Sequence, residues 1–237
     1  MAETRPELTR RPEAPPPPPW ALVGAEALQS QPGRVRAALT GGMGSGKTTV
    51  AELLRAFGAE LIDFDGLARE ALAPETPGWA QALELFGPKA KKPDNSLDRA
   101  RLAEIIFKKP DLRKALEAIV HPLTWELMGR RLAELQASPL VIIDVPLLFE
   151  ANLNSLFRPV IVCFASWETQ YQRLRSRDPN RSRGLTKKML QSQLPFSEKI
   201  RQADVVINND GSLIDLIRRA KDLWLMIKDY PGPAKTI

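Results

Sequence analysis

A single glycine-rich run restricts the possible folds of this chain more than any other part of its sequence. Residues 41–48 read GGMGSGKT, which matches the phosphate-loop pattern G-x-x-x-x-G-K-[ST]. Residues 35–39 before it predict a short strand, and the residues after it predict an amphipathic helix. The apolar face of that helix consists of Val50, Leu53, Leu54 and Phe57. Strand, loop and helix follow in the order in which backbone amides and a helix N-terminus together bind a phosphate.

The loop therefore predicts a nucleoside triphosphate as its ligand. In such loops the lysine, here Lys47, reaches the β- and γ-phosphates, and the next hydroxyl, here that of Thr48, ligates Mg²⁺. The glycines leave the backbone bare, so that its N–H groups can close around a phosphate.

The composition is that of an ordinary globular protein. The chain has 237 residues, of which 43% are hydrophobic and 26% charged, and no apolar run approaches the roughly 20 residues that span a bilayer. The N-terminal residues lack the apolar stretch of a signal peptide, so we expect a cytoplasmic protein. The single cysteine, Cys163, lies in the run PVIVCF, which excludes an intrachain disulfide and predicts a buried side chain.

The pattern of residues along the chain predicts an α/β fold between two tails. Residues 1–33 contain an uninterrupted proline run and predict a disordered tail, and residues 231–237 form a second tail. Between them, from 34 to 230, strand and helix patterns alternate. After the first strand, further strands are predicted at 59–63, 140–144, 160–164 and 204–208. The last three are β-branched runs, typical of a parallel sheet that is covered on both faces.

Two helical regions complete this prediction of a three-layer fold. Ser212 is expected to begin a final helix, whose apolar stripe is Leu213, Leu216, Ile217, Ala220, Leu223, Trp224 and Ile227. Residues 66–137 predict a helical insert, with helix starts at Ser96 or Asp98 and at Asp111, and a break at Pro122. The insert is too long for a plain crossover, so we expect it over the carboxyl ends of the strands, where ligands of open α/β sheets bind.

Two classes of phosphate-loop protein fit the sequence poorly. The run DFDG at 63–66 has the GTPase pattern D-x-x-G, but it follows the loop too closely, and the chain contains no N-K-x-D run. A nucleic-acid-dependent ATPase would need a second ATPase core or further basic and aromatic motifs, which the chain lacks. The net charge of +6 does not choose between classes, because nucleic acids and phosphorylated small molecules both attract a basic surface.

A kinase that acts on a small molecule explains more of the sequence. Asp63 and Asp65 stand at the carboxyl end of the second predicted strand. There, one carboxylate can accept the proton of an acceptor hydroxyl and the other can hold the substrate or hydrated magnesium. The arginine-rich stretch 171–184 predicts either a lid that closes on the transferring phosphoryl group or a solvated helix face.

Several runs, in this order, resemble the dephospho-coenzyme A kinase family. The loop and the residues after it, LTGGMGSGKTTVAELLRAFGAELIDFDGLARE, resemble the opening of that family, with its Asp-x-Asp and Ala-Arg pairs. Further matching runs are SLDRARLAEIIF, LEAIVHPL, DVPLLFE and QLPFSEKIRQADVVINNDGS. The resemblance covers about residues 35 to 225, and although the loop alone is generic, the ordered set is specific to this family.

The resemblance implies an activity, a fold and a set of partners. The activity is ATP-dependent phosphorylation of the ribose 3′-hydroxyl of dephospho-coenzyme A, the last step of coenzyme A synthesis. The implied fold is a phosphate-loop kinase fold with a parallel sheet, a helical substrate-binding insert at 66–137 and a lid region at 173–200. The implied ligands are ATP, Mg²⁺ and dephospho-coenzyme A. We also expect a monomer with no nucleic-acid or membrane partner. The alternatives are a kinase of another nucleoside or nucleotide, and a nucleotide-dependent nucleic-acid-binding protein.

The resemblance also implies roles for individual residues. Asp65 is implied as the general base, and the other implied catalytic residues are Lys47, Arg173 and Arg177. The implied ATP-binding residues are Gly41, Gly42, Met43, Gly44, Ser45, Gly46, Lys47, Thr48, Thr49, Asn209 and Gly211. The implied substrate-binding residues are Asp63, Asp65, Arg69, His121 and Glu150, and the candidate metal ligands are Thr48 and Asp144.

Some of these roles have a structural alternative. His121, the only histidine, either binds the acceptor or ends a helix before Pro122. Asp144 either helps to hold hydrated Mg²⁺ or caps the end of a strand. The sequence departs from the family pattern at Phe64, where a small residue is usual, and in the lid, which is longer and carries Lys187 and Lys188 where acidic residues are common.

Overall fold

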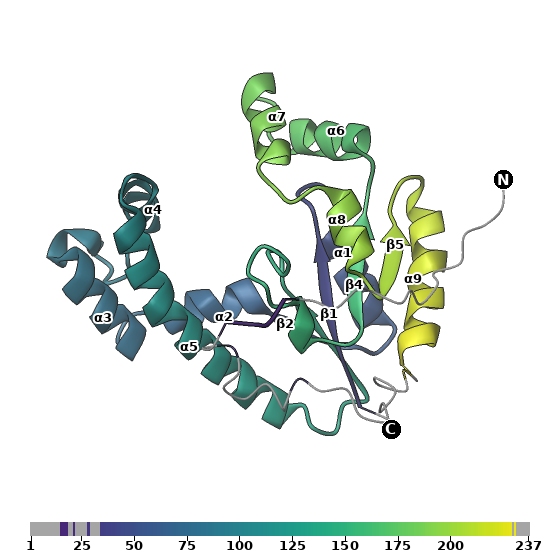
Figure 1. The fold of residues 1–237 in the computed structure, drawn as a ribbon, viewed down its shortest axis with the longest axis horizontal. Coiled ribbons are helices and arrows are strands. Elements are labelled where there is room, and N and C mark those ends of the chain that lie inside the picture. Colours follow the sequence, from purple (N-terminus) through teal and green to yellow (C-terminus); the bar gives the residue numbers. More distant parts are fainter. Residues whose placement is uncertain (1–14, 19–20, 22–27, 29–33, 229, 231–237) are drawn as a thin grey trace. The chain divides into compact units, whose positions relative to one another are not determined.

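The structure is a computed structural model that describes residues 15–18, 21, 28, 34–228 and 230 (Figure 1). The tails predicted at 1–33 and 231–237 lie largely outside the described residues. The described chain divides into two compact units. Residues 34–62 and 135–228 form the sheet unit, and residues 63–134 form the helical unit.

The sheet has five strands, which confirms the predicted α/β fold. They are β1 (Val35–Gly41), β2 (Glu60–Asp63), β3 (Leu140–Asp144), β4 (Val160–Phe164) and β5 (Val205–Asn208), in the spatial order β2-β3-β1-β4-β5. Strand β1 runs parallel to β3 and β4, and β4 runs parallel to β5. The loops that follow β1, β3, β4 and β5 therefore leave the sheet at the same edge, where polar residues cluster.

One face of the sheet is covered by α1 (Lys47–Ala56) and α9 (Leu213–Ile227), which contact each other. The apolar face predicted for α1 is confirmed, since Val50 and Leu54 are fully buried in the core of the sheet unit. The stripe predicted for α9 is partly wrong: Leu213 and Ile217 are 60% and 40% exposed. The remaining stripe residues are buried or packed against the core: Leu216, Ala220, Leu223, Trp224 and Ile227.

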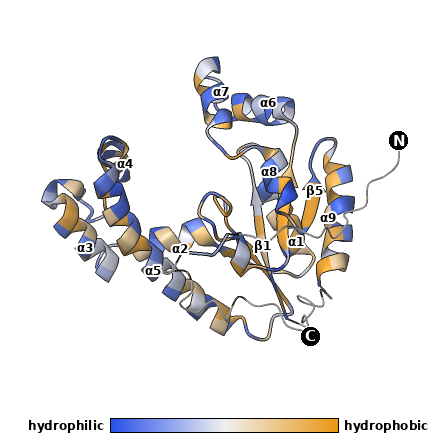
Figure 2. Ribbon diagram, viewed as in Figure 1, coloured by the Kyte–Doolittle hydropathy of each residue, from blue (hydrophilic) through white to orange (hydrophobic). Residues whose placement is uncertain are grey.

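The other elements of the sheet unit are η4 (Asn154–Leu156), α6 (Trp167–Arg177), α7 (Arg183–Gln191) and α8 (Phe196–Arg201). Helix α8 packs on β4, where the Phe196 ring meets the Phe164 ring edge to face at 5.1 Å. Figure 2 shows hydrophobic residues along β1 and β5 and mostly hydrophilic residues along α6 and α7. This contrast is expected because the strands are buried on both faces, whereas α6 and α7 are largely exposed.

Side-chain caps fix where most of these helices begin. Ser212 forms a capping box with Asp215 at the start of α9, which confirms the predicted helix start. Ser166 and Ser182 accept hydrogen bonds from the third residue of α6 and of α7. Ser166 follows β4 and Ser212 follows β5, so these two caps set the direction in which α6 and α9 leave the ligand edge of the sheet.

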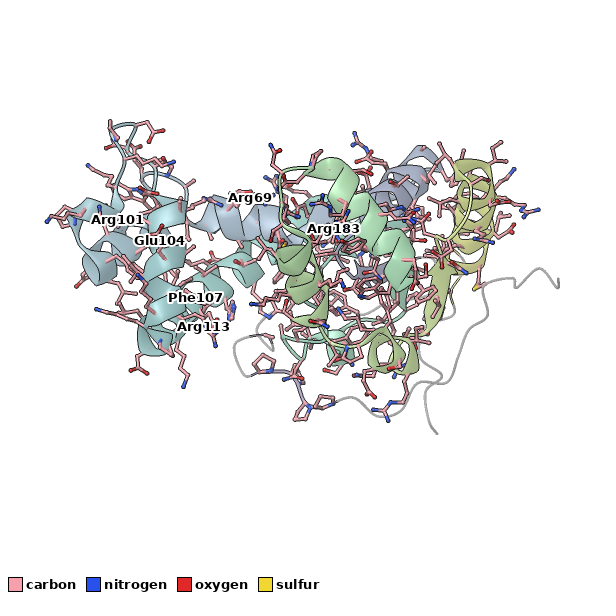
Figure 3. All side chains as sticks on the ribbon, turned by 90° about the horizontal axis from the view of Figure 1, so that it is seen from above. Arg69, Arg101, Glu104, Phe107, Arg113 and Arg183 are labelled. Atoms are coloured by element: carbon pink, nitrogen blue, oxygen red, sulfur yellow. The ribbon has the colours of Figure 1, made fainter. Side chains whose placement is uncertain are left out.

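The helical unit is built from α2 (Phe64–Ala71), α3 (Pro77–Phe86), η3 (Pro88–Ala90), α4 (Arg99–Lys108) and α5 (Pro110–Glu134). Of the two predicted starts for α4, Asp98 is the N-cap, since its carboxylate accepts from the Arg101 amide. One small buried cluster of this unit consists of Ala82, Ala90, Leu97 and Leu102. Phe107 on α4, labelled in Figure 3, is 89% exposed.

The break predicted at Pro122 is wrong, because α5 continues through that residue. A proline removes one backbone donor, which leaves the carbonyl four residues earlier, at Ala118, without its helical partner. Ala118 and Pro122 both lie on the exposed side of α5, where water can satisfy that carbonyl. Further along α5, buried Trp125, Met128 and Leu132 hold the helix in place. Side-chain burial along α5 therefore outweighs the loss of one solvent-facing hydrogen bond.

Candidate active site

The glycine-rich loop occupies the turn between β1 and α1, as predicted. Its glycines are required by the backbone, since Gly44 and Gly46 have φ values of 74° and 85°, in the left-handed region. A Cβ atom on Gly46 would lie 2.0 Å from Asn209 Nδ2, and one on Gly44 would lie 2.8 Å from the Gln170 carbonyl oxygen. The back of the loop is thus pressed against α6 and the residue that follows β5, with no room for a side chain.

Three donors converge on one carbonyl oxygen of the loop. The Ser45 oxygen accepts from Asn209 Nδ2 at 2.6 Å, from Arg173 Nη1 at 3.2 Å and from Cys163 Sγ at 3.3 Å. In a trans peptide the next N–H, that of Gly46, points opposite to this carbonyl. Holding the Ser45 oxygen at the back of the loop therefore turns the Gly46 amide towards the front, where an anion can bind it.

Arg173 completes this attachment from α6. Its second nitrogen, Nη2, donates to the Asn209 carbonyl at 2.9 Å, and Nη1 also lies 3.4 Å from the Gly44 carbonyl. The guanidinium therefore joins the loop to the segment that follows β5. In this arrangement Arg173 braces the loop, whereas the sequence analysis gave it a catalytic role.

The front of the loop opens onto a cavity of about 180 Å³. Beyond the loop itself it is lined by Pro146, Arg177 and Gln193. The lining loop residues are Gly41, Gly42, Met43, Gly44, Gly46, Lys47 and Thr48. Thr49, also predicted to bind ATP, is exposed in the first turn of α1 and is not among the lining residues. The cavity thus combines backbone amides, two cationic side chains and one hydroxyl, a donor set suited to phosphates and to a hydrated cation.

Lys47 and Asp144 form an ion pair at the edge of this cavity. Asp144 is the last residue of β3 and lies opposite Leu39 of β1, so the register of the sheet brings it to the loop. The two side chains are only 14% and 19% exposed, and partial burial strengthens their attraction. The strand-end position predicted for Asp144 is observed, and it puts a carboxylate beside the loop lysine.

Asp210 ties the ends of β4 and β5 together behind the loop. Its carboxylate accepts from the Ser166 amide at 2.9 Å and from the Ser166 hydroxyl at 3.1 Å. Burial raises the pKa of Asp210, but hydrogen bonds from Thr169 and Ser166 and the charge of Arg173 outweigh it, so the pKa is lowered overall. Gly211 follows with φ 116°, which turns the chain towards α9.

Cys163 is buried, as predicted, and unsuited to nucleophilic chemistry. Burial raises the pKa of its thiol to about 12, although the hydrogen bond to Ser45 opposes this shift. The side chain is therefore a neutral donor that helps to hold the loop.

The helical unit contains the carboxylates predicted at the end of β2. Asp63 is the N-cap of α2 and Asp65 lies in the first turn of that helix. The Asp63 carboxylate accepts from Arg69 Nη2 at 2.7 Å. It can fold back over α2 only because residue 66 is glycine, since a Cβ atom there would lie 2.8 Å from Asp63 Oδ2. Asp63 and Arg69 are 56% and 54% exposed, so water screens their attraction.

His121 lies on α5, half-buried in the helical unit. Burial lowers the pKa of its imidazole, while the charge of Glu117, one turn earlier, opposes the shift. The imidazole is therefore mostly neutral at pH 7. Since α5 continues through Pro122, the proposed structural role of ending a helix is excluded for His121.

Two further residues of the sheet unit, Lys199 and Gln193, have contacts that were not predicted from the sequence, and Gln193 also lines the cavity. Lys199 of α8 is fully buried, and its Nζ lies 2.8 Å from Glu150 Oε1, an ion-pair distance at an angle too poor for a hydrogen bond. Gln193 accepts a hydrogen bond from the Met43 amide. Both lie in the run QLPFSEKIRQADVVINNDGS, which resembles the family, so that run is the signal that could have pointed to them. Glu150, predicted to bind substrate, is occupied by Lys199 and by the Leu194 amide.

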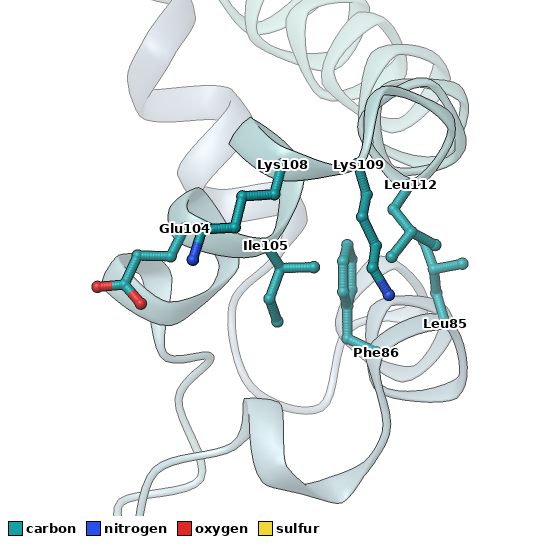
Figure 4. Close-up of a pocket in the computed structure, with 7 residues that line it drawn as sticks. All are labelled: Leu85, Phe86, Glu104, Ile105, Lys108, Lys109 and Leu112. Carbon is teal, nitrogen blue, oxygen red and sulfur yellow. The ribbon is translucent and has the colours of Figure 1, made fainter.

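A separate cavity of about 390 Å³ lies within the helical unit (Figure 4). Its lining residues are Leu85, Phe86, Glu104, Ile105, Lys108, Lys109 and Leu112. None of the residues predicted to bind substrate lines it. The predicted site residues are thus divided between the units. The loop, Asp144, Glu150, Arg173, Arg177, Asn209 and Gly211 belong to the sheet unit, and Asp63, Asp65, Arg69 and His121 belong to the helical unit.

Other kinds of site are not found in the described part of the chain. Within it, no three His, Cys, Asp or Glu side chains are grouped closely enough to hold a metal ion. None of its helices combines the length and apolar character needed to cross a bilayer.

Comparison with known proteins agrees with the geometry of the loop. The sequence model of the dephospho-CoA kinase family matches residues 35–215. A dephospho-CoA kinase of Streptomyces avermitilis is 43% identical over 198 residues, which cover 80% of this chain and 92% of that protein. TT1252 of Thermus thermophilus, a solved structure, has a TM-score of 0.72 at 35% identity and covers 81% of this chain and 96% of its own. The dephospho-CoA kinase of Campylobacter jejuni has a TM-score of 0.63 at 26% identity, with the same coverage. This chain therefore belongs to the dephospho-CoA kinase family.

Proposed function

We propose that this protein transfers the γ-phosphoryl group of ATP to the ribose 3′-hydroxyl of dephospho-coenzyme A. The observation that carries the proposal is the front of the loop, where backbone amides, Lys47, Thr48 and Arg177 line one cavity. Family membership supplies the acceptor. The two alternatives from the sequence, a kinase of another nucleotide and a nucleic-acid-binding protein, have no comparable support.

The loop holds the donor. Amides turned to the front, such as that of Gly46, would bind the phosphates, and the N-terminus of α1 adds partial positive charge. Lys47 would exchange its partner Asp144 for the β- and γ-phosphates. The cavity is small, so it accommodates the phosphates rather than the whole nucleotide.

The residues around Lys47 also fit a magnesium ion. The Thr48 hydroxyl and the Asp144 carboxylate are oxygen ligands of the kind that Mg²⁺ prefers, and Mg²⁺ in kinases is held by few protein groups together with phosphates. That fits the lack of a larger acidic cluster among the described residues. Bound there, the ion would neutralise charge on the β- and γ-phosphate oxygens.

The acceptor side uses the carboxylates of α2. Asp65 would accept the proton of the 3′-hydroxyl while the new O–P bond forms and the bond to ADP breaks. Asp63, paired with Arg69, would position the acceptor, as would His121. Arg177 would neutralise the charge that spreads over the transferring group. Arg173 and Asn209 would act indirectly, by holding the loop in shape.

The test is to follow ADP release with several acceptors in parallel. We expect turnover with dephospho-coenzyme A and at least 10²-fold less with AMP or adenosine, as an order of magnitude for a site that hydrogen-bonds its acceptor. Mass spectrometry and ³¹P NMR identify the product and the position of the phosphate. Equal turnover with AMP would support the related-kinase alternative.

The remaining proposals concern partners. We propose a cytoplasmic monomer that needs only ATP, Mg²⁺ and dephospho-coenzyme A. Sedimentation at working concentrations tests the oligomeric state. Binding to DNA or RNA with a steep salt dependence would support the nucleic-acid alternative instead.

A further inference from the structure

Gln193 contacts the phosphate loop from outside it. It stands two residues after the end of α7, and its side-chain oxygen Oε1 accepts a hydrogen bond from the Met43 amide at 2.8 Å. The same residue lines the cavity in front of the loop together with Lys47, Thr48 and Arg177. Gln193 is therefore placed both to fix the loop and to meet whatever the loop binds.

The chemistry of a carboxamide defines what Gln193 can offer to a ligand. The Met43 amide is a donor, so the oxygen of Gln193 is the atom that faces it. The other half of the same planar group is an NH₂, which donates hydrogen bonds. A donor beside two cationic side chains suits a phosphate oxygen.

The backbone around Gln193 is firmly held. The next amide, that of Leu194, donates to Glu150 Oε1 at 3.3 Å, and Glu150 is paired with the fully buried Lys199. Two residues further on, Phe196 packs so close to the loop that a Cβ atom on Gly42 would lie 2.9 Å from its ring. A buried ion pair and a ring packed against glycine fix residues 193–196 against the loop.

We propose that Gln193 is an additional ATP-binding residue whose NH₂ group donates to the terminal phosphate. In loops of this kind the backbone amides cradle the α- and β-phosphates, which leaves the γ-phosphate to side chains. Lys47 is one such side chain, and two others line the same cavity: Arg177, the last residue of α6, and Gln193, two residues after α7. The proposal rests on the assignment of this cavity to the phosphates of ATP.

The test compares Gln193→Glu with Gln191→Glu by titrating each protein with ATP and with ADP. Gln193→Glu keeps an oxygen for the Met43 amide but replaces the NH₂ with a charged oxygen. Gln191→Glu makes the same charge change at an exposed position two residues away. Losing a hydrogen bond to a charged group and adding repulsion should weaken ATP binding by Gln193→Glu about tenfold or more. ADP binding should change by about threefold at most, and Gln191→Glu should match the wild type for both.

Further measurements distinguish a failure of the role proposed for Gln193 from a failure of the assignment of the cavity to ATP. Equal weakening of ATP and ADP binding, or no change in either, overturns the role of Gln193. If Lys47→Ala leaves ATP binding unchanged, the assignment of the cavity fails instead. Should Gln193→Glu not fold, as judged by thermal unfolding, Gln193→Asn replaces it. That variant keeps the carboxamide but is one methylene too short to reach Met43 and a phosphate together, so the same selective loss of ATP binding is expected.

Discussion

The two units of this protein place their charged groups in opposite environments. In the sheet unit, Lys47 and Asp144 are mostly buried, and the Ser45 carbonyl behind them accepts from three donors. In the helical unit, Asp63 and Arg69 are more than half exposed, and Asp65 is exposed as well. The fold itself fixes the geometry around the loop. Water screens the exposed side chains of the helical unit, so they are held only weakly, and an acceptor that binds them, as proposed, would have to order them.

The described hydrophobic clusters of the two units also differ, in size. The sheet unit buries a large cluster that includes β1, β3, β4, α1 and α9. In the helical unit, one described cluster consists of Ala82, Ala90, Leu97 and Leu102, and Leu67, Trp125, Met128 and Leu132 are buried as well. Regions with few buried apolar contacts have low local stability and open most readily. We therefore expect the region around Leu102 to open more readily than the core of the sheet unit.

The largest effect is expected from Lys47→Ala on the rigid side. It removes one of the two cationic side chains that line the cavity, and we expect kcat to fall about 10³-fold, because a charge placed at the transferring group acts mainly in the transition state. Steady-state kinetics measure it. The control is Lys221→Ala, an exposed lysine on α9, which should retain full activity. Retention of activity by Lys47→Ala would contradict the assigned site.

A smaller loss is expected from Asp65→Asn on the exposed side. If Asp65 takes the proton of the acceptor, kcat should fall about 10²-fold with little change in KM for the acceptor. The matched control is Asp111→Asn, an exposed acid in the first turn of α5, which loses the same charge at a helix N-terminus. A higher KM with unchanged kcat would make Asp65 a binding residue only.

A pair of cavity-forming substitutions measures the difference between the cores. Ile142→Ala removes a fully buried side chain in the centre of the sheet, and Leu102→Ala removes one from the small cluster of the helical unit. Both substitutions should lower the free energy of unfolding. Because the smaller cluster can collapse around its cavity, we expect Leu102→Ala to lower it by about 1–2 kcal/mol less than Ile142→Ala does. Urea unfolding measures both. Equal losses would contradict the expected difference between the two clusters.

The smallest effect is expected from the pH dependence of His121. Burial lowers its pKa in the folded state, so below about pH 6.5 the unfolded chain binds more protons than the folded one. The free energy of unfolding should therefore decrease as the pH falls from about 6.5 through the lowered pKa. His121→Gln should remove this part of the slope, because the chain has no other histidine. The measurement is the free energy of unfolding of the wild type and of His121→Gln at several pH values between 7 and 5. Identical pH dependence in the two proteins would exclude a contribution of His121.

Local patterns along the chain predicted most of the fold and part of the site. The glycine loop, the β-branched strands and the Ser212 cap are each encoded by neighbouring residues, and all are observed. The strand-end position of Asp144 followed from the length of its apolar run. What the sequence could not reveal depends on residues far apart in the chain. The attachment of the Ser45 carbonyl needs a residue 164 positions away, and the contact of Gln193 with Met43 spans 150 positions.

Two wrong predictions have the same cause. Proline reliably breaks a helix only where buried side chains do not offset the lost hydrogen bond. At Pro122 the buried residues of α5 offset that loss. On α9 the apolar stripe is wider than the surface that covers it, so Leu213 and Ile217 remain exposed. Periodicity identifies the apolar positions of a helix, but only the packed neighbours decide which of them are covered.

The attachment of the Ser45 carbonyl also has a consequence for how the protein is made. The loop is synthesised early, at residues 41–48, but Cys163, Arg173 and Asn209, which shape its back, follow much later. A nascent chain that still lacks residue 209 contains the glycine-rich motif but not the Asn209 hydrogen bond that holds the Ser45 carbonyl in place. We therefore expect that nucleotide does not stabilise the chain before residue 209 has been made, and that fragments that end before β5 bind ATP poorly although their loop glycines are present.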